Sequence, residues 1–246
     1  MRSARPDPPD AGDAIQLDGP ASPESSLASP TSLPSLARLL LVRHGQSTWN
    51  REHRIQGHLD PPLSEDGRRQ AARLGLRLAG RLFAGFYTSD LKRAAETAQA
   101  VADSIGVEPK PEPGLREIFL GDWEGLRTEE IAQRFPEAWA SWSEEPDWDV
   151  VPKSEGAAPF EARVAATLNA IFDRHQSGDV LVVTHGGVIQ VALHRAVGRQ
   201  SSGLFPFKIE NASISVVEKR DGRMIIGGVN DTAHLEPALA SESGPG

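Results

Sequence analysis

From Arg38 onwards the chain alternates short apolar runs with amphipathic segments, a pattern typical of an α/β sheet covered by helices. Residues 39–42 and 180–183 are continuous apolar runs, which predicts two buried strands. A further short strand is predicted at 86–89. A hairpin with its turn at 221–222 is expected to close the chain.

Three amphipathic segments are predicted to be helices, because apolar residues recur in them at spacings of three and four. The apolar stripes are Ala71, Leu74, Leu78 and Leu82 in the first, Ala94, Ala98, Val101 and Ile105 in the second, and Phe160, Val164, Leu168, Ile171 and Phe172 in the third. Ser64 can cap the first helix, Gly106 is expected to end the second, and the third should end near Gly178. A further helix is predicted over 188–197. The expected fold class is α/β: a three-layer sandwich with a mostly parallel central sheet flanked by helices.

Both ends of the chain differ from its middle in composition. Residues 1–36 are rich in Pro, Ser, Asp, Ala and Gly, and the same composition returns at 236–246. Such segments bury too little apolar surface to offset the entropy of ordering, so both are expected to be disordered tails. One folded domain is expected over 37–235, with a small inserted helical cap at about 126–158.

Composition also excludes several classes of protein. The chain has no cysteine, which rules out disulfides, thiolate metal sites and cysteine nucleophiles. A formal net charge of −8 argues against nucleic acid and anionic membranes as partners. No apolar run approaches the roughly 18 residues of a membrane span, and no signal-peptide pattern is present. We therefore expect a cytoplasmic protein with no membrane or nucleic-acid partner; a homodimer stays open.

Two predicted strands are each followed by a histidine and a glycine, at His44 and at His185. Because ligands of open α/β sheets bind at the carboxyl ends of strands, both histidines are expected to face one crevice. The glycines allow close backbone approach, and the helix start after His185 offers free N–H groups to an anion. Arg43 and Arg93 add planar cationic forks that suit phosphate oxygens, so a phosphate site is predicted.

At these residues the sequence resembles the histidine phosphatase superfamily, also called phosphoglycerate mutase-like. The nucleophile motif of that family is similar to residues 41–50 (LVRHGQSTWN), and its second arginine motif to residues 89–98 (SDLKRAAETA). Its acid motif resembles residues 115–125 (LREIFLGDWEG), and its second histidine motif resembles residues 182–187 (VVTHGG). The four motifs occur in the family's order, and the resemblance covers roughly residues 38–230.

The resemblance implies a covalent mechanism. His44 would attack phosphorus through an unprotonated ring nitrogen, while a hydrogen-bond acceptor holds the other nitrogen. Arg43, Arg93 and His185 would surround the phosphate oxygens. Glu117 would protonate the leaving alkoxide and then activate the water that hydrolyses the phosphohistidine. No metal and no other cofactor is implied, because these side chains neutralise the phosphate charge.

Further residues are implied to contact the phosphate or the rest of a small-molecule phosphate ester. They are Gln46, Ser47, Asn50, Gln56, Gly57 and Gly186. Many relatives have Glu where this chain has Gln46, and residues 153–158 depart from the Pro-Gly-Gly-Glu-Ser form common in the family. The resemblance therefore does not define how the cap contacts the substrate.

Alternatives remain for several residues. Glu124 is a rival of Glu117 for the role of proton donor. The cap tryptophans, Trp139, Trp142 and Trp148, could pack its short helices or form an apolar wall for the leaving group. The other histidines have no motif around them and are expected at the surface or in packing, where the first two could rim the site: His53, His58, His175, His194 and His234. No two histidines are four residues apart, as a helical zinc site would require.

The main functional choice is between a phosphatase and a mutase. A phosphoglycerate mutase must hold a second anionic group, and family mutases do this with basic residues in an insertion after the acid motif. Here residues 126–158 contain only Arg127, Arg134 and Lys153 as basic residues, among many acidic ones. We therefore predict a metal-independent phosphomonoesterase that hydrolyses a small phosphorylated metabolite through a phosphohistidine intermediate. The alternatives are a mutase-type phosphoryl transferase and a noncatalytic phospho-ligand-binding protein.

Overall fold

The computed structural model describes residues 36–203, 205–220 and 222–236. The tails predicted at 1–36 and 236–246 lie outside these residues, apart from Leu36 and Glu236. None of the helices in the described ranges is long and apolar enough to cross a membrane.

The described residues form a six-stranded sheet with the strand order β3-β2-β4-β1-β5-β6. The strands are β1 (Ala37–Arg43), β2 (Gly85–Thr88), β3 (Lys110–Pro111), β4 (Gly178–Thr184), β5 (Ile214–Arg220) and β6 (Arg223–Asp231). The first four run parallel to one another, whereas β5 is antiparallel to β1 and forms an antiparallel hairpin with β6. Within the predicted hairpin turn, Asp221 lies outside the described residues.

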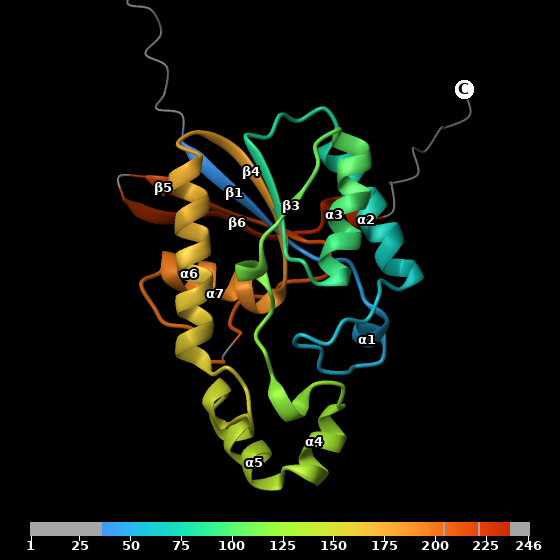
Figure 1. The fold of residues 1–246 in the computed structure, drawn as a ribbon, viewed down its shortest axis with the longest axis vertical. Coiled ribbons are helices and arrows are strands. Elements are labelled where there is room, and N and C mark those ends of the chain that lie inside the picture. The colour runs from blue at the N-terminus through green and yellow to red at the C-terminus, as the bar shows by residue number, and fades with distance from the viewer. Residues whose placement is uncertain (1–35, 204, 221, 237–246) are drawn as a thin grey trace, which may run out of the picture. The chain divides into compact units, whose positions relative to one another are not determined.

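Helices cover both faces of this sheet (Figure 1). On one face α2 (Glu65–Leu78) and α3 (Lys92–Ile105) pack together, and on the other lie α6 (Ala157–Arg174) and α7 (Gly186–Ala196). The mostly parallel sheet between two helical layers confirms the three-layer α/β sandwich that the sequence predicts.

The central strand β1 contributes to two hydrophobic cores. Leu40 and Val42 point into the core beneath α2 and α3, whereas Leu39 and Leu41 point into the core beneath α6 and α7. A strand that is buried on both faces needs apolar residues at successive positions, which explains the continuous run at 39–42.

The remaining helices are short. They are α1 (Thr48–Arg51), α4 (Thr128–Arg134) and α5 (Pro136–Glu144), with 3₁₀ turns at Pro113–Leu115, Gly121–Trp123, Trp148–Val150 and Ala233–Leu235. The helices α4 and α5 fall within the segment expected to form the cap. They lie beyond the edge of the sheet at which β1 and β4 end (Figure 1).

The structure differs from the predicted elements mainly at helix ends. Leu82 was expected on the buried stripe of the first helix, but α2 ends at Leu78 and the Leu82 side chain is 92% exposed. Gly80 follows with a φ of 77°, a left-handed conformation that turns the chain away from the helix. The helix α6 ends at Arg174. Gly178, where the helix was expected to end, is already the first residue of β4. The capping serine and the left-handed Gly106 are confirmed.

Candidate functional site

Three neighbouring parallel strands, β2, β4 and β1, end at the same edge of the sheet, and each is followed by a polar side chain. These side chains are Ser89, His185 and His44. The backbone N–H of His44 donates to the carbonyl of Thr184 at 2.9 Å, so the two histidines follow paired positions of adjacent strands. Their ring centroids lie 5.2 Å apart, so the two imidazoles lie next to each other at this edge of the sheet.

The imidazole of His44 is buried and oriented. Its Nδ1 lies 2.7 Å from the carbonyl oxygen of Gly45, which can only accept, so Nδ1 carries the proton. The Nε2 atom is then unprotonated, and it receives the Nε–H of Arg93 at 3.3 Å. Burial, followed by the charges of Arg93 and Arg43, holds the pKa of His44 well below its ordinary value. His44 is therefore a neutral imidazole with an unprotonated Nε2, the form that a nucleophile requires.

The loop that carries His44 is held by close backbone contacts. The N–H of Gly45 donates to Oγ1 of Thr97 at 3.0 Å, and Nδ2 of Asn211 donates to the carbonyl of His44 at 3.0 Å. A Cβ atom at Gly45 would lie 2.6 Å from the carbonyl oxygen of Gly67, so the glycine lets the loop press against the start of α2. These contacts fix the position of the imidazole.

Two arginines flank His44: Arg93 is buried and Arg43 is partly buried. The Nη1 of Arg43 donates to the carbonyl of Ile209 at 2.7 Å. The guanidinium of Arg93 donates to the carbonyls of Leu59 at 3.0 Å and Gly57 at 2.8 Å. Burial lowers the pKa of Arg93 to about 10, so its guanidinium stays charged at neutral pH. Among the described residues no carboxylate forms an ion pair with either arginine, and cations held by carbonyl dipoles make a site that favours an anion.

His185 is held by Ser89. Its Nε2 lies 2.8 Å from Oγ of Ser89, and that oxygen already accepts the N–H of Leu91 at 3.3 Å. The hydroxyl proton of Ser89 is thus available for Nε2, which places the ring proton on Nδ1. In the described chain Nδ1 is buried without a hydrogen-bond partner. Burial and the neighbouring Arg93 hold the pKa of His185 well below its ordinary value, so His185 is a neutral donor.

Glu117 lies at the N-terminus of α7. Its Oε2 accepts the N–H of Gly187 at 3.1 Å, and its Oε1 accepts the N–H of Ile118 at 3.1 Å. A Cβ atom at Gly187 would lie 2.3 Å from Oε1 of Glu117, so only glycine allows the carboxylate this close to the helix. This contact accounts for the second glycine after His185.

Glu124, the rival proton donor, has a different environment. Its Oε1 accepts the N–H groups of His58 at 2.8 Å and Leu120 at 3.0 Å, and its Oε2 accepts that of Leu59 at 3.2 Å. Glu124 is not among the residues that line the cavity around His44, whereas Glu117 is. The geometry therefore favours Glu117 as the group that reaches a ligand.

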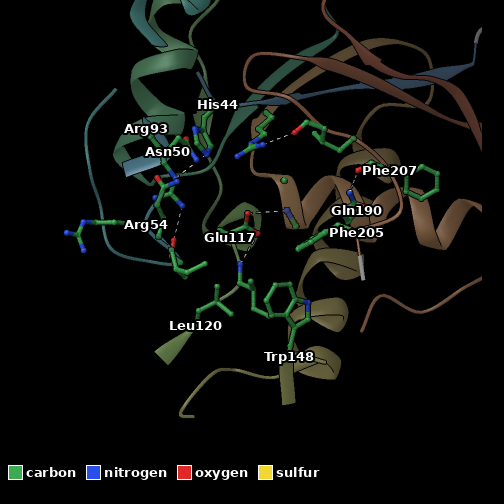
Figure 2. Close-up of a pocket in the computed structure, with 18 residues that line it drawn as sticks. His44, Asn50, Arg54, Arg93, Glu117, Leu120, Trp148, Gln190, Phe205 and Phe207 are labelled. Carbon is green, nitrogen blue, oxygen red and sulfur yellow. Dashed lines mark hydrogen bonds between the residues drawn. The ribbon is translucent and has the colours of Figure 1, made fainter. Parts of the chain in front are cut away.

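A cavity of about 410 Å³ connects these groups. Figure 2 shows Glu117 between two ends of this cavity. His44, Arg93 and Asn50 lie on one side of Glu117, and Arg43, Gln56, Gly57 and Gly186 also line the cavity. On the other side lie Leu120, Trp148, Phe205 and Phe207, with Gln190 as a polar neighbour. Further apolar lining residues are Ile55, Ile118 and Ile209. The site can therefore bind an anion at one end and an apolar group at the other.

Some residues expected to contact the ligand do not line the cavity. Gln46 accepts the hydroxyl of Ser64 through Oε1 at 2.8 Å. Ser47 caps α1 and donates to Oε1 of Gln56 at 2.7 Å. His185 is fully buried and is not among the lining residues, but its ring lies 5.2 Å from that of His44. Sequence analysis did not single out Arg54, Phe205, Phe207 or Ile209, because no motif or periodic pattern contains them. Gln190 lies in a predicted helix, but the periodicity of a helix does not identify a polar lining residue.

Of the cap tryptophans, one lines the cavity and the other two pack the short helices. Trp148 lines the apolar end of the cavity, with Phe205 at a ring-centroid distance of 5.4 Å. Trp142 packs between Trp148 at 4.7 Å and Trp123 at 5.6 Å, and Trp139 also packs on Trp123 at 6.2 Å. Only Trp148 of the three is among the lining residues, so the other two support the wall from behind.

The remaining histidines make local contacts. His53 is exposed, whereas His58, His175, His194 and His234 bond to Glu117 O, Tyr87 Oη, Gln190 O and Ala212 O, respectively. Within the described ranges no group of three or more His, Asp or Glu side chains is arranged to hold a metal ion.

Comparison with known proteins identifies relatives of the whole folded region. The family model for the histidine phosphatase superfamily (branch 1) matches residues 39–232. The sequence is 39% identical over 214 residues to phosphoglycerate mutase-like protein 4 of Arabidopsis thaliana, covering 85% of this chain and 92% of that protein. It is 36% identical over 203 residues to a metal-independent phosphoserine phosphatase of Arabidopsis thaliana, covering 81% and 84%. The solved structure of Bacillus stearothermophilus YhfR is similar with a TM-score of 0.75 at 34% identity, covering 81% of this chain and 100% of that one.

Proposed function

The chain belongs to branch 1 of the histidine phosphatase superfamily and is a phosphatase of that type, and we propose that it hydrolyses small phosphomonoesters without a metal ion. The phosphate would be held covalently on His44 between the two steps. The observation that supports this proposal is the unprotonated Nε2 of His44, which lies beside Arg93 in the cavity that Glu117 also lines.

In the first step, Nε2 of His44 attacks phosphorus, and the bond from phosphorus to the ester oxygen breaks. Glu117 gives its proton to that oxygen, so a neutral alcohol leaves. The guanidinium groups of Arg43 and Arg93 and the Nδ1–H of His185 stabilise the charge on the phosphate oxygens. The products of this step are phosphohistidine and the carboxylate of Glu117.

In the second step, Glu117 takes a proton from a water molecule whose oxygen attacks phosphorus. The phosphorus–nitrogen bond breaks, and its electron pair returns to Nε2 of His44. Inorganic phosphate leaves, and Glu117 is protonated again. One carboxyl group thus serves both steps, and the cycle restores every group to its starting state.

The cavity offers little for a second anionic group. Apart from Arg43 and Arg93, Arg54 is the basic side chain among the described lining residues, and it pairs with Glu130 at 3.1 Å and Glu52 at 3.2 Å. The basic residues of segment 126–158 are not among those lining residues. This favours hydrolysis over phosphoglycerate mutase activity, which needs a second anion site.

We expect phosphate release from phosphomonoesters in the presence of EDTA. The physical reason is that Arg43, Arg93 and His185 supply the charge neutralisation that a metal supplies elsewhere. The measurement is a panel of sugar phosphates, phosphoglycerates, phosphoserine, nucleotides and aryl phosphates, with and without added divalent ions. Activity that EDTA abolishes and a divalent ion restores would refute metal independence. Interconversion of 2- and 3-phosphoglycerate that outpaces every hydrolysis would refute the phosphatase assignment.

The apolar end of the cavity supports a more specific substrate class. The leaving group would lie beyond Glu117, against Leu120, Trp148 and Phe205. Such a wall favours an alcohol or phenol that presents an apolar face, because a polyhydroxylated group would lose hydration there without regaining its hydrogen bonds. The segment 126–158 would then act as a cap that contributes Trp148 to specificity.

Trp148→Leu is expected to raise KM for an aryl phosphate by about 10-fold, while KM for a small polar ester such as glycerol phosphate changes little. The indole ring contacts only the apolar part of the leaving group, so its loss weakens that binding selectively. Trp139→Leu is the matched control, because Trp139 belongs to the same aromatic cluster but does not line the cavity. Equal changes for both esters, or for both variants, would contradict the assigned leaving-group site.

A further inference from the structure

We propose that Arg163 is a positioning residue that holds Glu117 at the reacting centre by binding the backbone of residues 114–117. This inference rests on the proposed function, because it takes Glu117 to be the group that transfers protons. Arg163 lies on α6 and is not among the residues that line the cavity. Arg163 would therefore affect catalysis by positioning the backbone of residues 114–117, without contacting the substrate.

The guanidinium of Arg163 binds three backbone carbonyls of one short segment. Its Nη1 donates to the carbonyl of Gly114 at 3.1 Å and to that of Arg116 at 2.9 Å. Its Nη2 donates to the carbonyl of Glu117 at 3.2 Å. The guanidinium of Arg163 thus attaches the backbone of residues 114–117 to one side of α6.

Glu155 completes this attachment on the other side of Glu117. Its carboxylate binds Arg163 through Nη2 at 2.5 Å and Nε at 3.3 Å, which fixes the orientation of the guanidinium. The same carboxylate accepts the N–H of Phe119 at 2.8 Å, and the N–H of Glu155 donates to the carbonyl of Phe119 at 3.1 Å. The segment on both sides of Glu117 is therefore attached to one ion pair.

The main chain of Glu117 needs such support. Outside its own segment, its carboxylate is held by the N–H of Gly187, and its carbonyl is contacted by His58 Nε2 at 2.8 Å as well as by Arg163. A displacement of about 1 Å in a proton-transferring group can cost about 100-fold in rate. Lysine cannot replace Arg163 here, because an ammonium lacks the planar fork that reaches carbonyls and carboxylate together.

The test compares Arg163→Lys with Arg174→Lys, a change of an exposed arginine on the same helix. We expect Arg163→Lys to lower kcat on an alkyl phosphate by about 10- to 100-fold, with KM changed far less because the phosphate contacts remain. The initial burst of nitrophenol from p-nitrophenyl phosphate should slow much less, because that leaving group needs little protonation. Arg174→Lys should match the wild type.

A double variant separates positioning from a merely structural role. In a Glu117→Gln background, Arg163→Lys should cause no further loss on the alkyl phosphate, because the group that it positions has gone. A loss of similar size in both backgrounds, or an equal loss for alkyl and aryl esters, would overturn the proposal. If Arg163→Lys does not fold, Glu155→Gln replaces it in the test. This variant keeps an acceptor for the N–H of Phe119 but weakens the ion pair, so the same kinetic results are expected of it. If Glu117→Gln turns over substrate as fast as the wild type, the role of Glu117 is overturned as well. If Glu117→Gln is impaired but Arg163→Lys is normal, only this inference is overturned.

Discussion

His44→Ala is expected to reduce turnover to near background for every phosphomonoester, whatever its leaving group. The substitution removes Nε2, the atom that would bond to phosphorus, while Arg43 and Arg93 remain to bind phosphate. Substrate affinity should therefore fall much less than kcat. Steady-state kinetics with one alkyl and one aryl ester, together with a direct binding measurement of inorganic phosphate, check both parts.

His53→Asn is the control for this result. His53 is exposed, with a left-handed φ of 58° that asparagine tolerates, so this variant should keep wild-type turnover. Substantial steady turnover by His44→Ala would eliminate the covalent mechanism. It would leave the arginines as a site for direct attack by water.

Glu117→Gln is expected to separate substrates by their leaving groups. Glutamine keeps the shape of the side chain and an acceptor for the N–H of Gly187 but cannot donate or take the required proton. Turnover of alkyl phosphates should fall by about 10² to 10⁴-fold, the usual range for general acid–base catalysis. With p-nitrophenyl phosphate the first step should be slowed much less, because nitrophenolate leaves without a proton. The second step still lacks its base, so phosphohistidine should accumulate.

Glu124→Gln provides the comparison for that variant. Glu124 binds three backbone N–H groups and lies outside the cavity lining, so any loss from its substitution should be the same for alkyl and aryl esters. An unchanged rate on alkyl phosphates for Glu117→Gln, with a large loss for Glu124→Gln, would move the proton donor to Glu124.

The anion end of the site could be predicted from the sequence, because local patterns define it. A buried strand leaves a continuous apolar run, and a polar residue directly after such a run must lie at the strand's carboxyl end. The rule therefore predicts that His44 and His185 lie close together. Ser89 follows β2 in the same way, but the strand predicted at 86–89 included it, so it was not expected at the strand's end.

The apolar end could not be predicted, because its residues come from separate loops with no shared period. Trp148 and Phe205 meet only because the chain after α7 returns toward the cap. The role of Arg163 could not be predicted for a related reason: three of its partners are backbone carbonyls, which leave no trace in the side-chain pattern. The wrong assignment of Leu82 shows the limit of periodicity, since the stripe continues past the residue at which the helix ends. The disordered tails, the cytoplasmic location and a homodimer stay predictions.

The central claim, a phosphate held on His44, is tested most directly by rapid-quench kinetics of Glu117→Gln with p-nitrophenyl phosphate. Intact-protein and peptide masses are measured at neutral or alkaline pH, because phosphohistidine is labile to acid. We predict a burst of nitrophenol approaching one equivalent per protein, with one phosphoryl group located on His44. A steady release of nitrophenol without a burst and without an adduct, or a phosphoryl group on any other residue, would contradict the mechanism.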